Sequence, residues 1–232
     1  MDCDPGASAE TEMRETEKPF WESAYSRTGS PDTFNSGRPS WDVVEVLEKH
    51  LQKGKVLDLG CGDGRNALYA AGLGYDVTAV DISRAGIAKL KSLAKAQGMK
   101  VKAVVRDMRR YQPDEYFDAV ISHGCLHLLR REEWVKVLNN IKAMTAPGGL
   151  NVVVVFTDKV PPSADMAPFT KGLFREEELF DHYSGWTVHH RSSRIFEDDH
   201  DGGIHHVHAV NRIISRKPAT STVPDGFRNL LK

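Results

Sequence analysis

Residues 56–81, VLDLGCGDGRNALYAAGLGYDVTAVD, hold the side chains and glycines whose spacing most clearly suggests ligand binding. A short apolar run leads into a turn with a glycine at every second position, and a second apolar run ends in a carboxylate. A glycine turn between a strand and a helix lets backbone N–H groups at the helix N-terminus approach a ligand. The residues concerned are Asp58, Gly60, Gly62, Gly64 and Asp81.

The glycine spacing argues against the common phosphate-binding turns. A dinucleotide fingerprint reads G-x-G-x-x-G, whereas here the third glycine comes two residues after the second and position 65 is Arg. The G-x-x-x-x-G-K-[ST] pattern of a P-loop is also absent. Asp58 would repel a pyrophosphate but can accept a hydrogen bond from an ammonium group. S-adenosylmethionine (SAM) carries an ammonium group and no phosphate, so the turn indicates SAM and therefore methyl transfer.

Carboxylates at the ends of successive strands complete the predicted cofactor site. Asp81 can accept hydrogen bonds from two ribose hydroxyls, and Asp107 can accept one from the adenine amino group. Each carboxylate alone could equally be an ordinary strand-end residue, but their combination with the turn favours SAM. The predicted cofactor-binding residues are Tyr25, Asp58, Gly60, Cys61, Gly62, Arg65, Asn66, Asp81, Ile82, Asp107, Met108 and Ser122, with Ile82 and Met108 offering apolar faces to the adenine ring.

The elements that must position these residues alternate between strand and helix. Ser40 is expected to cap a helix through Leu51, and Ser83 a helix that ends near Gly98. Further helices are expected at 66–73, 132–144 and 175–183, turns at 146–149 and 197–203, and strands at 55–59, 76–80, 100–105, 117–122, 150–156, 187–196 and 204–215. The pattern predicts an α/β, Rossmann-like fold: a seven-stranded, mostly parallel sheet with an antiparallel C-terminal hairpin and helices on both faces.

Length and composition fit one globular domain. The chain has 232 residues, of which 40% are hydrophobic and 27% charged. We expect a disordered tail at 1–18, a single domain at 19–216 and a flexible tail at 217–232. Within the domain, residues 19–40 form an aromatic arm that is either a lid over the site or an ordinary helix packed on the core.

Charge and cysteine content restrict the partners and the compartment. The net charge of −1 gives no support for nucleic-acid binding, and no apolar run approaches the roughly 20 residues of a membrane span. The N-terminus lacks the features of a signal peptide, and three cysteines form no disulfide framework. We expect a cytoplasmic protein with a small-molecule substrate and leave its oligomeric state open.

Longer stretches extend the match to a family. Residues 40–156 resemble class I SAM-dependent methyltransferases. The runs LDLGCGDGRNALYAAGLGYDVTAVDIS, PGGLNVVVVFTD, FREEELFDHYSGWTV and RIISRK closely resemble the tellurite-resistance methyltransferases (TehB-like), over about four fifths of the chain. The arm FWESAYSR…TFNSGRPS resembles the aromatic arm of thiopurine and thiol methyltransferases, which packs over the cofactor. The His-rich stretch EDDHDGGIHHVH departs in length from the bacterial tellurite enzymes.

Histidines follow the fourth predicted strand, in the segment ISHGCLHLL. Ligands of open α/β sheets bind at the carboxyl ends of the strands, so Ser122, His123, Cys125 and His127 are expected near the SAM sulfonium. His123 or His127 is predicted to line the methyl-transfer pocket. The alternative is that Cys125 packs in the core and one histidine caps the next helix.

A second group of histidines lies around the C-terminal hairpin. An H-x-H pair on a strand can ligate zinc or copper, but a polar sheet edge is the favoured interpretation and no metal is expected. The family resemblance implies that a His and an Arg from this segment receive the substrate. The candidates are His200, His205, His206, Arg191, Arg194 and Arg212, and the predicted catalytic set is His123, His127, His200, His206 and Arg191.

These features predict a methyltransferase that acts on a small soft nucleophile. Tellurite- or selenite-derived species and thiols need little activation for an in-line displacement, and no Asn/Asp-Pro-Pro-Tyr motif follows the fourth strand. One alternative is a small-molecule O- or N-methyltransferase. Another is a SAM-binding regulator without turnover, which formation of S-adenosylhomocysteine would distinguish from an enzyme.

Overall fold

The computed structural model describes residues 20–26, 37–200 and 204–219. The expected tail at 1–18 and most of the one at 217–232 lie outside these residues, as do residues 19 and 27–36 of the arm and the tip of the hairpin. The helices are α1 (Phe20–Ser26), α2 (Trp41–Glu45), α3 (Arg65–Gly72), α4 (Arg84–Ala96), α5 (Arg131–Met144) and α6 (Glu178–Asp181), with a π-helical turn η2 (Val46–His50) and 3₁₀ turns η3 (Met108–Arg110) and η4 (Leu126–Leu128). The strands are β1 (Lys55–Leu59), β2 (Asp76–Asp81), β3 (Lys102–Val105), β4 (Phe117–His123), β5 (Thr145–Phe156), β6 (Thr187–His200) and β7 (Ile204–Arg216).

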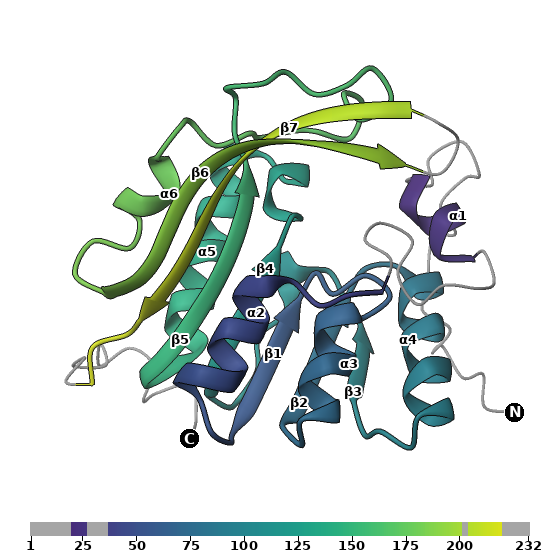
Figure 1. The fold of residues 1–232 in the computed structure, drawn as a ribbon, viewed down its shortest axis with the longest axis vertical. Coiled ribbons are helices and arrows are strands. Elements are labelled where there is room, and N and C mark those ends of the chain that lie inside the picture. Colours follow the sequence, from purple (N-terminus) through teal and green to yellow (C-terminus); the bar gives the residue numbers. More distant parts are fainter. Residues whose placement is uncertain (1–19, 27–36, 201–203, 220–232) are drawn as a thin grey trace, which may run out of the picture.

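The strands form one seven-stranded sheet in the order β3-β2-β1-β4-β5-β7-β6, which confirms the predicted fold (Figure 1). The pairs from β3 to β5 are parallel, whereas β7 runs antiparallel to both β5 and β6. The chain moves outward from β1 to β3 and then returns to place β4 on the other side of β1. A ligand site is expected at this switch point, above the carboxyl ends of β1 and β4.

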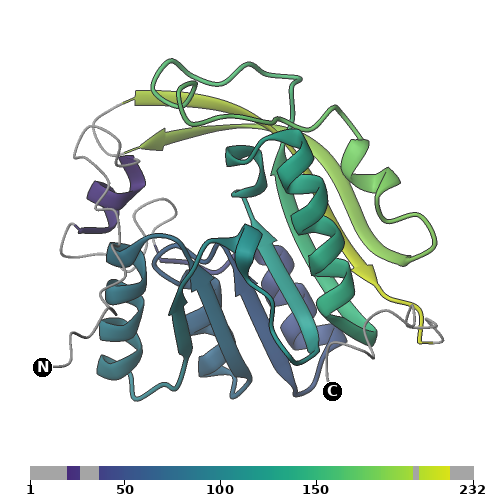
Figure 2. The ribbon, with the colours of Figure 1, turned by 180° about the vertical axis from the view of Figure 1, so that it is seen from behind.

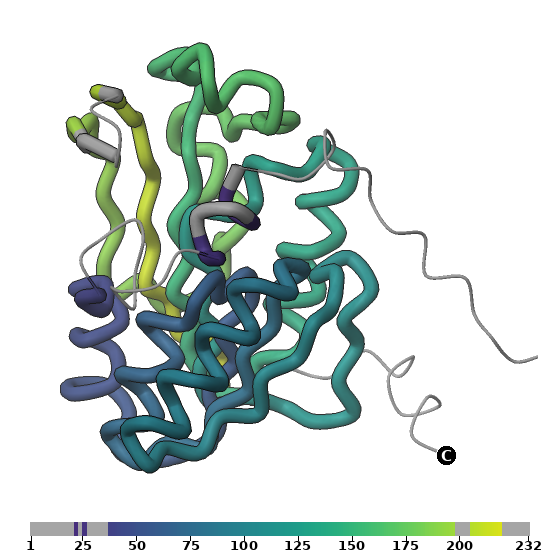
Figure 3. Tube along the Cα trace, turned by 90° about the vertical axis from the view of Figure 1, so that its right-hand side faces the viewer, coloured from purple at the N-terminus to yellow at the C-terminus, as the bar shows by residue number. Residues whose placement is uncertain are grey.

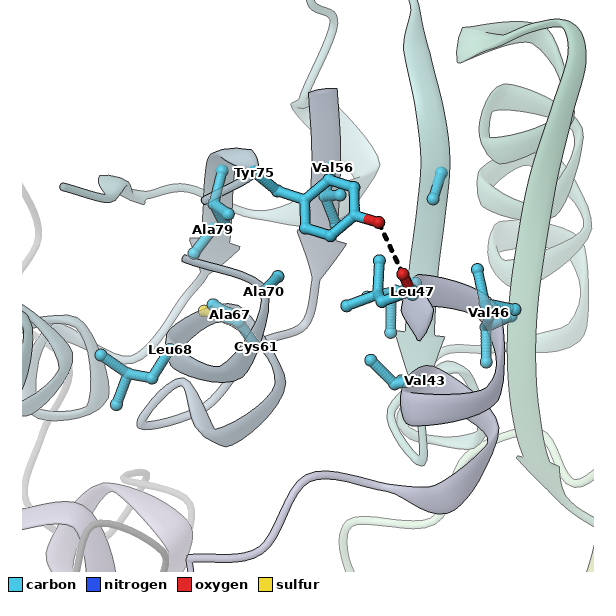
Figure 4. Close-up of a cluster of buried hydrophobic side chains, with 14 of the residues drawn as sticks. Val43, Val46, Leu47, Val56, Cys61, Ala67, Leu68, Ala70, Tyr75 and Ala79 are labelled. Carbon is cyan, nitrogen blue, oxygen red and sulfur yellow. Dashed lines mark hydrogen bonds between the residues drawn. The ribbon is translucent and has the colours of Figure 1, made fainter. Parts of the chain in front are cut away.

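Helices cover both faces of the sheet, as Figures 1 and 2 show from opposite sides. One core cluster lies between the sheet and α2, η2, α3 and α4, and the other lies beneath α5 and α6. In the first cluster the Tyr75 hydroxyl donates a hydrogen bond of 2.6 Å to the Leu47 carbonyl oxygen (Figure 4). Residues 152–155 of β5 are valines buried on both faces, as expected for a strand between two helical layers.

The hairpin of β6 and β7 is longer than predicted. Its pairing runs from Thr187 opposite Arg216 to His200 opposite Ile204, so residues 197–200, expected in a turn, continue the strand. The pairing of β5 with β7 ends at Phe156 and Val210, and the hairpin continues beyond it toward α1. Figure 3 shows the far part of the hairpin and the 157–174 segment above the parallel strands. The sequence pattern placed the two strands correctly but not the extent of their pairing.

Three other local predictions need correction. The helix expected at 175–183 is only α6, because Glu177 adopts a left-handed φ of 67° that interrupts a longer helix. The turn expected at 146–149 lies within β5 as an irregularity between the pairs Phe117–Thr145 and Ala119–Leu150. Lys217, expected in the flexible tail, is anchored because its Nζ donates to the carbonyls of Lys142 and Thr145 at 2.8 and 2.7 Å. Within the described residues, no helix combines the length and apolar character that crossing a membrane requires.

Candidate cofactor and acceptor site

The turn between β1 and α3 requires glycine at each of its three repeated positions. Gly60, Gly62 and Gly64 have φ values of 80°, 58° and 90°, a region that other residues rarely adopt. A Cβ on Gly60 would lie 2.5 Å from the Cys125 sulfur, and a Cβ on Gly62 would overlap the Tyr25 hydroxyl. The backbone N–H groups of Gly60 and Cys61 donate to the Val80 carbonyl at 2.8 and 3.1 Å, which fixes the turn against β2.

Asp58 lies directly beneath this turn and has an unused carboxylate oxygen. Its side chain is buried, and Oδ2 has no hydrogen-bond partner among the described residues. Burial raises the pKa of Asp58 to about 7, with Arg65 opposing and Asp81 reinforcing the shift. A buried carboxylate oxygen without a partner is costly unless a donor reaches it, and an ammonium group is such a donor. The site therefore fits the ammonium group of SAM.

Asp81 ties the glycine turn to the start of α4. Its Oδ2 accepts from the Gly62 N–H and its Oδ1 from the Ser83 N–H, both at 2.8 Å. Burial raises the pKa of Asp81, while these backbone hydrogen bonds oppose the shift. Beside it Ile82 is 54% exposed, so its apolar side chain is open to contact with a planar ring.

Replacing Asp81 with Ala is expected to weaken SAM binding by about 1–3 kcal/mol, because charged hydrogen bonds to the ribose are lost. Titration calorimetry of SAM into the variant measures this change directly. Asp76→Ala, at the exposed opposite end of the same strand, is the matched control and should bind SAM normally. Normal SAM binding by the Asp81 variant would contradict the assignment of Asp81 to the cofactor.

The Asp107 carboxylate is already engaged by a neighbouring arginine. It caps η3 by accepting from the Arg109 N–H at 2.9 Å and also accepts from the Arg109 side chain, which in turn contacts Glu133 at 2.6 Å. Burial alone would raise the pKa of Asp107, but the hydrogen bonds from Arg109 outweigh it and lower the pKa. The group stays anionic, and its contact with the adenine amino group remains a prediction.

The helix α1 lies over the glycine turn. Tyr25 contacts Gly62, and the Glu22 carboxylate accepts hydrogen bonds from the Ser83 hydroxyl and from the Ala85 N–H, the latter at 3.0 Å. Trp21 meets Phe169 edge to face with ring centroids 5.5 Å apart. The helix thus connects the start of α4 to the 157–174 segment, which is where a lid would close.

A second cluster surrounds His123 at the end of β4. His123 pairs with Val154 of β5, which pairs with Arg212 of β7, so the two side chains lie on the same face of the sheet. The His123 Nε2 lies 2.7 Å from the Ser40 hydroxyl and 3.3 Å from Arg212 Nη1, and its Nδ1 lies 3.3 Å from Arg65 Nη2. Arg212 also donates to the buried Asp42 at 2.8 Å.

His123 is a neutral member of this cluster. Burial lowers its pKa to about 3, and the charges of Arg65 and Arg212 act in the same direction against that of Asp42. The two guanidinium groups therefore remain as the positive charges of the cluster, and a neutral imidazole with this pKa is a weak proton acceptor. The cluster is better suited to holding an anion than to removing a proton.

The other predicted catalytic residues do not join His123. Arg191 is exposed and lies over the Phe180 ring, 5.6 Å from its centroid. The arginine of the hairpin that contacts His123 is Arg212. His200 pairs with Ile204 in the hairpin, and its side chain lies outside the described residues. The hairpin register places Arg191 opposite Ile213 on the edge strand, on the face of the sheet opposite to that of Arg212 and His123.

His127 and His206 are buried around Phe156 instead. His127 stacks on Phe156 at 4.3 Å, its two ring nitrogens have no hydrogen-bond partner among the described residues, and burial lowers its pKa to about 3. His206 lies 3.1 Å from Asp165 and meets His208 edge to face. The described residues include no group of three or more His, Cys, Asp or Glu side chains placed to hold a metal ion. Next to this cluster, a small pocket is lined by Phe156, Thr157, Val160, Pro161, Pro162, Met166, Thr170, Leu173, Val207, His208 and Ala209.

Several predicted cofactor residues have other contacts. Asn66 accepts from the Ser40 N–H at 2.9 Å and so positions the segment before α2. The Ser122 hydroxyl and the Cys125 thiol lie 3.3 Å apart and are buried, and burial raises the pKa of Cys125 to about 12. Cys61 is also a buried thiol.

Sequence reasoning missed Ser40 and Asp42 as members of the site. Ser40 precedes α2 as predicted, but its side chain makes no capping hydrogen bond and instead contacts His123. Asp42 would be interpreted as an ordinary acidic residue in a first helical turn. The available signal was Asp42 beside apolar Val43 and Val44, at a helix start that belongs to the core face.

Comparisons with known proteins agree with this geometry. The family model described as "Tellurite resistance protein TehB" matches residues 31–217. The probable S-adenosyl-L-methionine-dependent methyltransferase TehB of Haemophilus influenzae is 35% identical over 155 residues, covering 66% of this chain and 52% of that protein. The chain thus spans about half the length of the curated TehB relatives it matches.

Solved structures show the same fold. The crystal structure of TehB from Haemophilus influenzae aligns with a TM-score of 0.69 and 30% identity, covering 77% of this chain and 62% of that one. The N-methyltransferase NodS from Bradyrhizobium japonicum, in complex with S-adenosyl-L-homocysteine, aligns with a TM-score of 0.60 at 16% identity, covering 77% and 85% of the two chains. With the glycine turn, the unpartnered Asp58 oxygen and the family match over most of its length, the chain belongs to the TehB family of class I SAM-dependent methyltransferases.

Proposed function

We propose that the chain transfers a methyl group from SAM to a small, soft, anionic nucleophile, such as a tellurite- or selenite-derived species or a thiolate. The observation that carries this proposal is the pair Arg65 and Arg212, which flank a neutral His123 on the sheet face that also bears Asp58. Two positive charges without a strong base suit an acceptor that is already deprotonated.

Methyl transfer from SAM requires little of the protein beyond the alignment of the acceptor with the methyl group. SAM supplies a methyl group that its sulfonium already activates for displacement. The acceptor lone pair forms the bond to the methyl carbon while the carbon–sulfur bond breaks, and that electron pair stays on sulfur. An anionic acceptor releases no proton, so Arg65 and Arg212 hold it and Tyr25 and Trp21 of α1 help exclude water.

A small-molecule O- or N-methyltransferase is the second candidate. The pocket beside Phe156 is lined mostly by apolar side chains, which suit the apolar part of an organic acceptor. A relative named 2-heptyl-1-hydroxyquinolin-4(1H)-one methyltransferase, from Mycobacteroides abscessus, is 29% identical over 76% of this chain and 80% of that protein. An organic acceptor that extends into this pocket is therefore the main competitor to a small anion.

Turnover of SAM tests the proposal. The purified chain is incubated with SAM and with tellurite, selenite, a small thiol, or a panel of phenols and amines, and S-adenosylhomocysteine is measured against a sample without acceptor. We expect product with the soft acceptors. Product only with phenols or amines would favour the second candidate, and SAM binding without product from any acceptor would favour a regulator without turnover.

A further inference from the structure

Asp42 is a buried carboxylate whose side-chain partners belong to the proposed acceptor site or to its own helix. It is 1% exposed, and its Oδ2 accepts from Arg212 Nη1 at 2.8 Å while its Oδ1 accepts from the Val43 N–H at 3.0 Å. Burial alone would raise the pKa of Asp42, but the pKa is lowered, and the Ser40 hydroxyl is among the groups that favour the charged form. Burying an ion pair costs desolvation free energy and often gives no net stability, so its presence at a site points to a role in organising that site.

The directions of the hydrogen bonds select one form of His123. A guanidinium can only donate, and each ring nitrogen of His123 faces one at 3.3 Å: Nδ1 faces Arg65 Nη2, and Nε2 faces Arg212 Nη1. Arg212 Nη1 has a nearer acceptor in Asp42 Oδ2 at 2.8 Å, and Nε2 has a nearer partner in the Ser40 oxygen at 2.7 Å, so we assign the acceptor role to Nδ1. The neutral imidazole then carries its proton on Nε2 and donates to the Ser40 oxygen at 2.7 Å. The Ser40 hydroxyl proton is then left to face Asp42, whose charged form the hydroxyl favours, so the chain of donors from Arg65 ends on a carboxylate.

The same carboxylate sets the orientation of Arg212. The contacts of its guanidinium with Asp42, Ser40 and His123 all use Nη1, at 2.8, 3.5 and 3.3 Å. Among the described residues no hydrogen bond uses the Nε–Nη2 edge, which is the edge that binds an oxyanion through two parallel hydrogen bonds. Side-chain exposure of 17% shows that the group is held in the site and is not freely solvated.

We propose that Asp42 is a positioning residue for methyl transfer, holding Arg212 with its Nε–Nη2 edge toward the acceptor and, through Ser40, His123 with its proton on Nε2. The inference rests on the proposed function, because it assigns the acceptor to this cluster. The charged and titratable groups that face His123 are Arg65 from α3, Arg212 from β7 and Asp42 from α2. Asp42 itself neither touches the acceptor nor exchanges a proton.

Asp42→Asn tests the proposal, because it keeps the size of the side chain and removes its charge. ¹⁵N NMR of the chain with labelled histidines reports the tautomer of His123 in the absence of SAM and acceptor. We expect His123 to be mainly Nε2–H in the wild type and a mixture of tautomers in the variant. We also expect KM for the acceptor to rise about tenfold or more, with SAM affinity by calorimetry unchanged.

Two further variants separate positioning from folding. Ser40→Ala interrupts the path to His123 but keeps the Arg212–Asp42 pair, so it should change the tautomer with a smaller effect on KM. Asp181→Asn makes the same chemical change on an exposed residue of α6 and should alter neither quantity. Normal SAM affinity in each variant shows that the cofactor half of the fold is intact.

The outcomes distinguish this inference from the proposed function. An unchanged tautomer and an unchanged KM in Asp42→Asn, with wild-type turnover of an anion, overturn the positioning role and leave the proposed function intact. A wild-type chain that methylates none of the anions defeats the proposed function, and a tautomer change in Asp42→Asn then still supports the hydrogen-bond network. A loss of turnover with kcat reduced and KM unchanged would place Asp42 outside acceptor binding.

Discussion

Arg212→Lys is expected to lower kcat/KM for an oxyanion acceptor about 100-fold and to leave the affinity for SAM unchanged. Lysine keeps the positive charge and can still pair with Asp42, so the buried carboxylate retains a partner. It lacks the planar Nε–Nη2 edge that a guanidinium offers to two oxygens of one acceptor. Steady-state kinetics over a range of acceptor concentrations, together with SAM calorimetry, measure both quantities.

Arg194→Lys is the matched control for this change. Arg194 is exposed on β6 and pairs with Val210 in the same hairpin, and it was one of the arginines that the sequence left open. A comparable loss in Arg194→Lys would indicate a general effect on the hairpin. Full activity of Arg212→Lys would show that charge alone suffices and would remove the oriented guanidinium from the acceptor site.

The cofactor half of the site could be predicted from sequence because it is local. Asp58, the three glycines and Asp81 lie within 24 consecutive residues, in a strand–turn–helix–strand unit whose geometry is set by short-range rules. The positive φ values and the unpartnered Asp58 oxygen agree with what that pattern requires. The parallel sheet could be predicted for the same reason, because a chain of alternating strands and helices is compatible with few sheet topologies.

The acceptor half could not be predicted because its members are distant in sequence. Ser40 and Asp42 reach His123 across more than 80 residues, and Arg212 reaches Asp42 across 170. Choosing Arg212 over Arg191 requires the register of β7 against β5, which depends on packing of the whole sheet edge. A strand-end position made His123 a good candidate, whereas His127 shows that the next histidine, only four residues later, can be a core residue.

The histidines of the hairpin illustrate the same limit. Alternation on β7 correctly places His206 and His208 on one face, but the sequence could not tell whether that face is a solvated edge, a metal site or a core. In the structure both are buried against Phe156, Asp165 and each other, so the favoured expectation of a polar sheet edge was wrong for these two residues. His205, on the opposite face, is exposed beside Glu197 and fits that expectation.

Asp58 should make the free energy of unfolding depend on pH in a direction unusual for a carboxylate. Burial raises its folded-state pKa to about 7, above its value in the unfolded chain, so the native state binds the proton more tightly. Stability from this group is present at low pH and is lost as pH rises through about 7, a difference of about 4 kcal/mol between pH ~4 and pH ~8. The amide side chain of the Asp58→Asn variant cannot ionise. The difference in the free energy of unfolding between wild type and variant, measured by denaturant titration at each pH, therefore isolates the contribution of Asp58.

The same ionisation should control SAM binding with the opposite sign. Only the charged carboxylate attracts the ammonium group, so SAM affinity should fall up to about tenfold per pH unit as pH decreases from ~7 to ~5.5, where the ammonium itself stays protonated. In Asp58→Asn the affinity should be low and nearly independent of pH over this range. SAM therefore binds best in the pH range in which ionised Asp58 destabilises the free protein. The ammonium group of SAM supplies the hydrogen-bond partner that Asp58 Oδ2 lacks in the free protein. A wild-type affinity that stays constant from pH ~5.5 to ~7 would show that Asp58 does not receive the ammonium group.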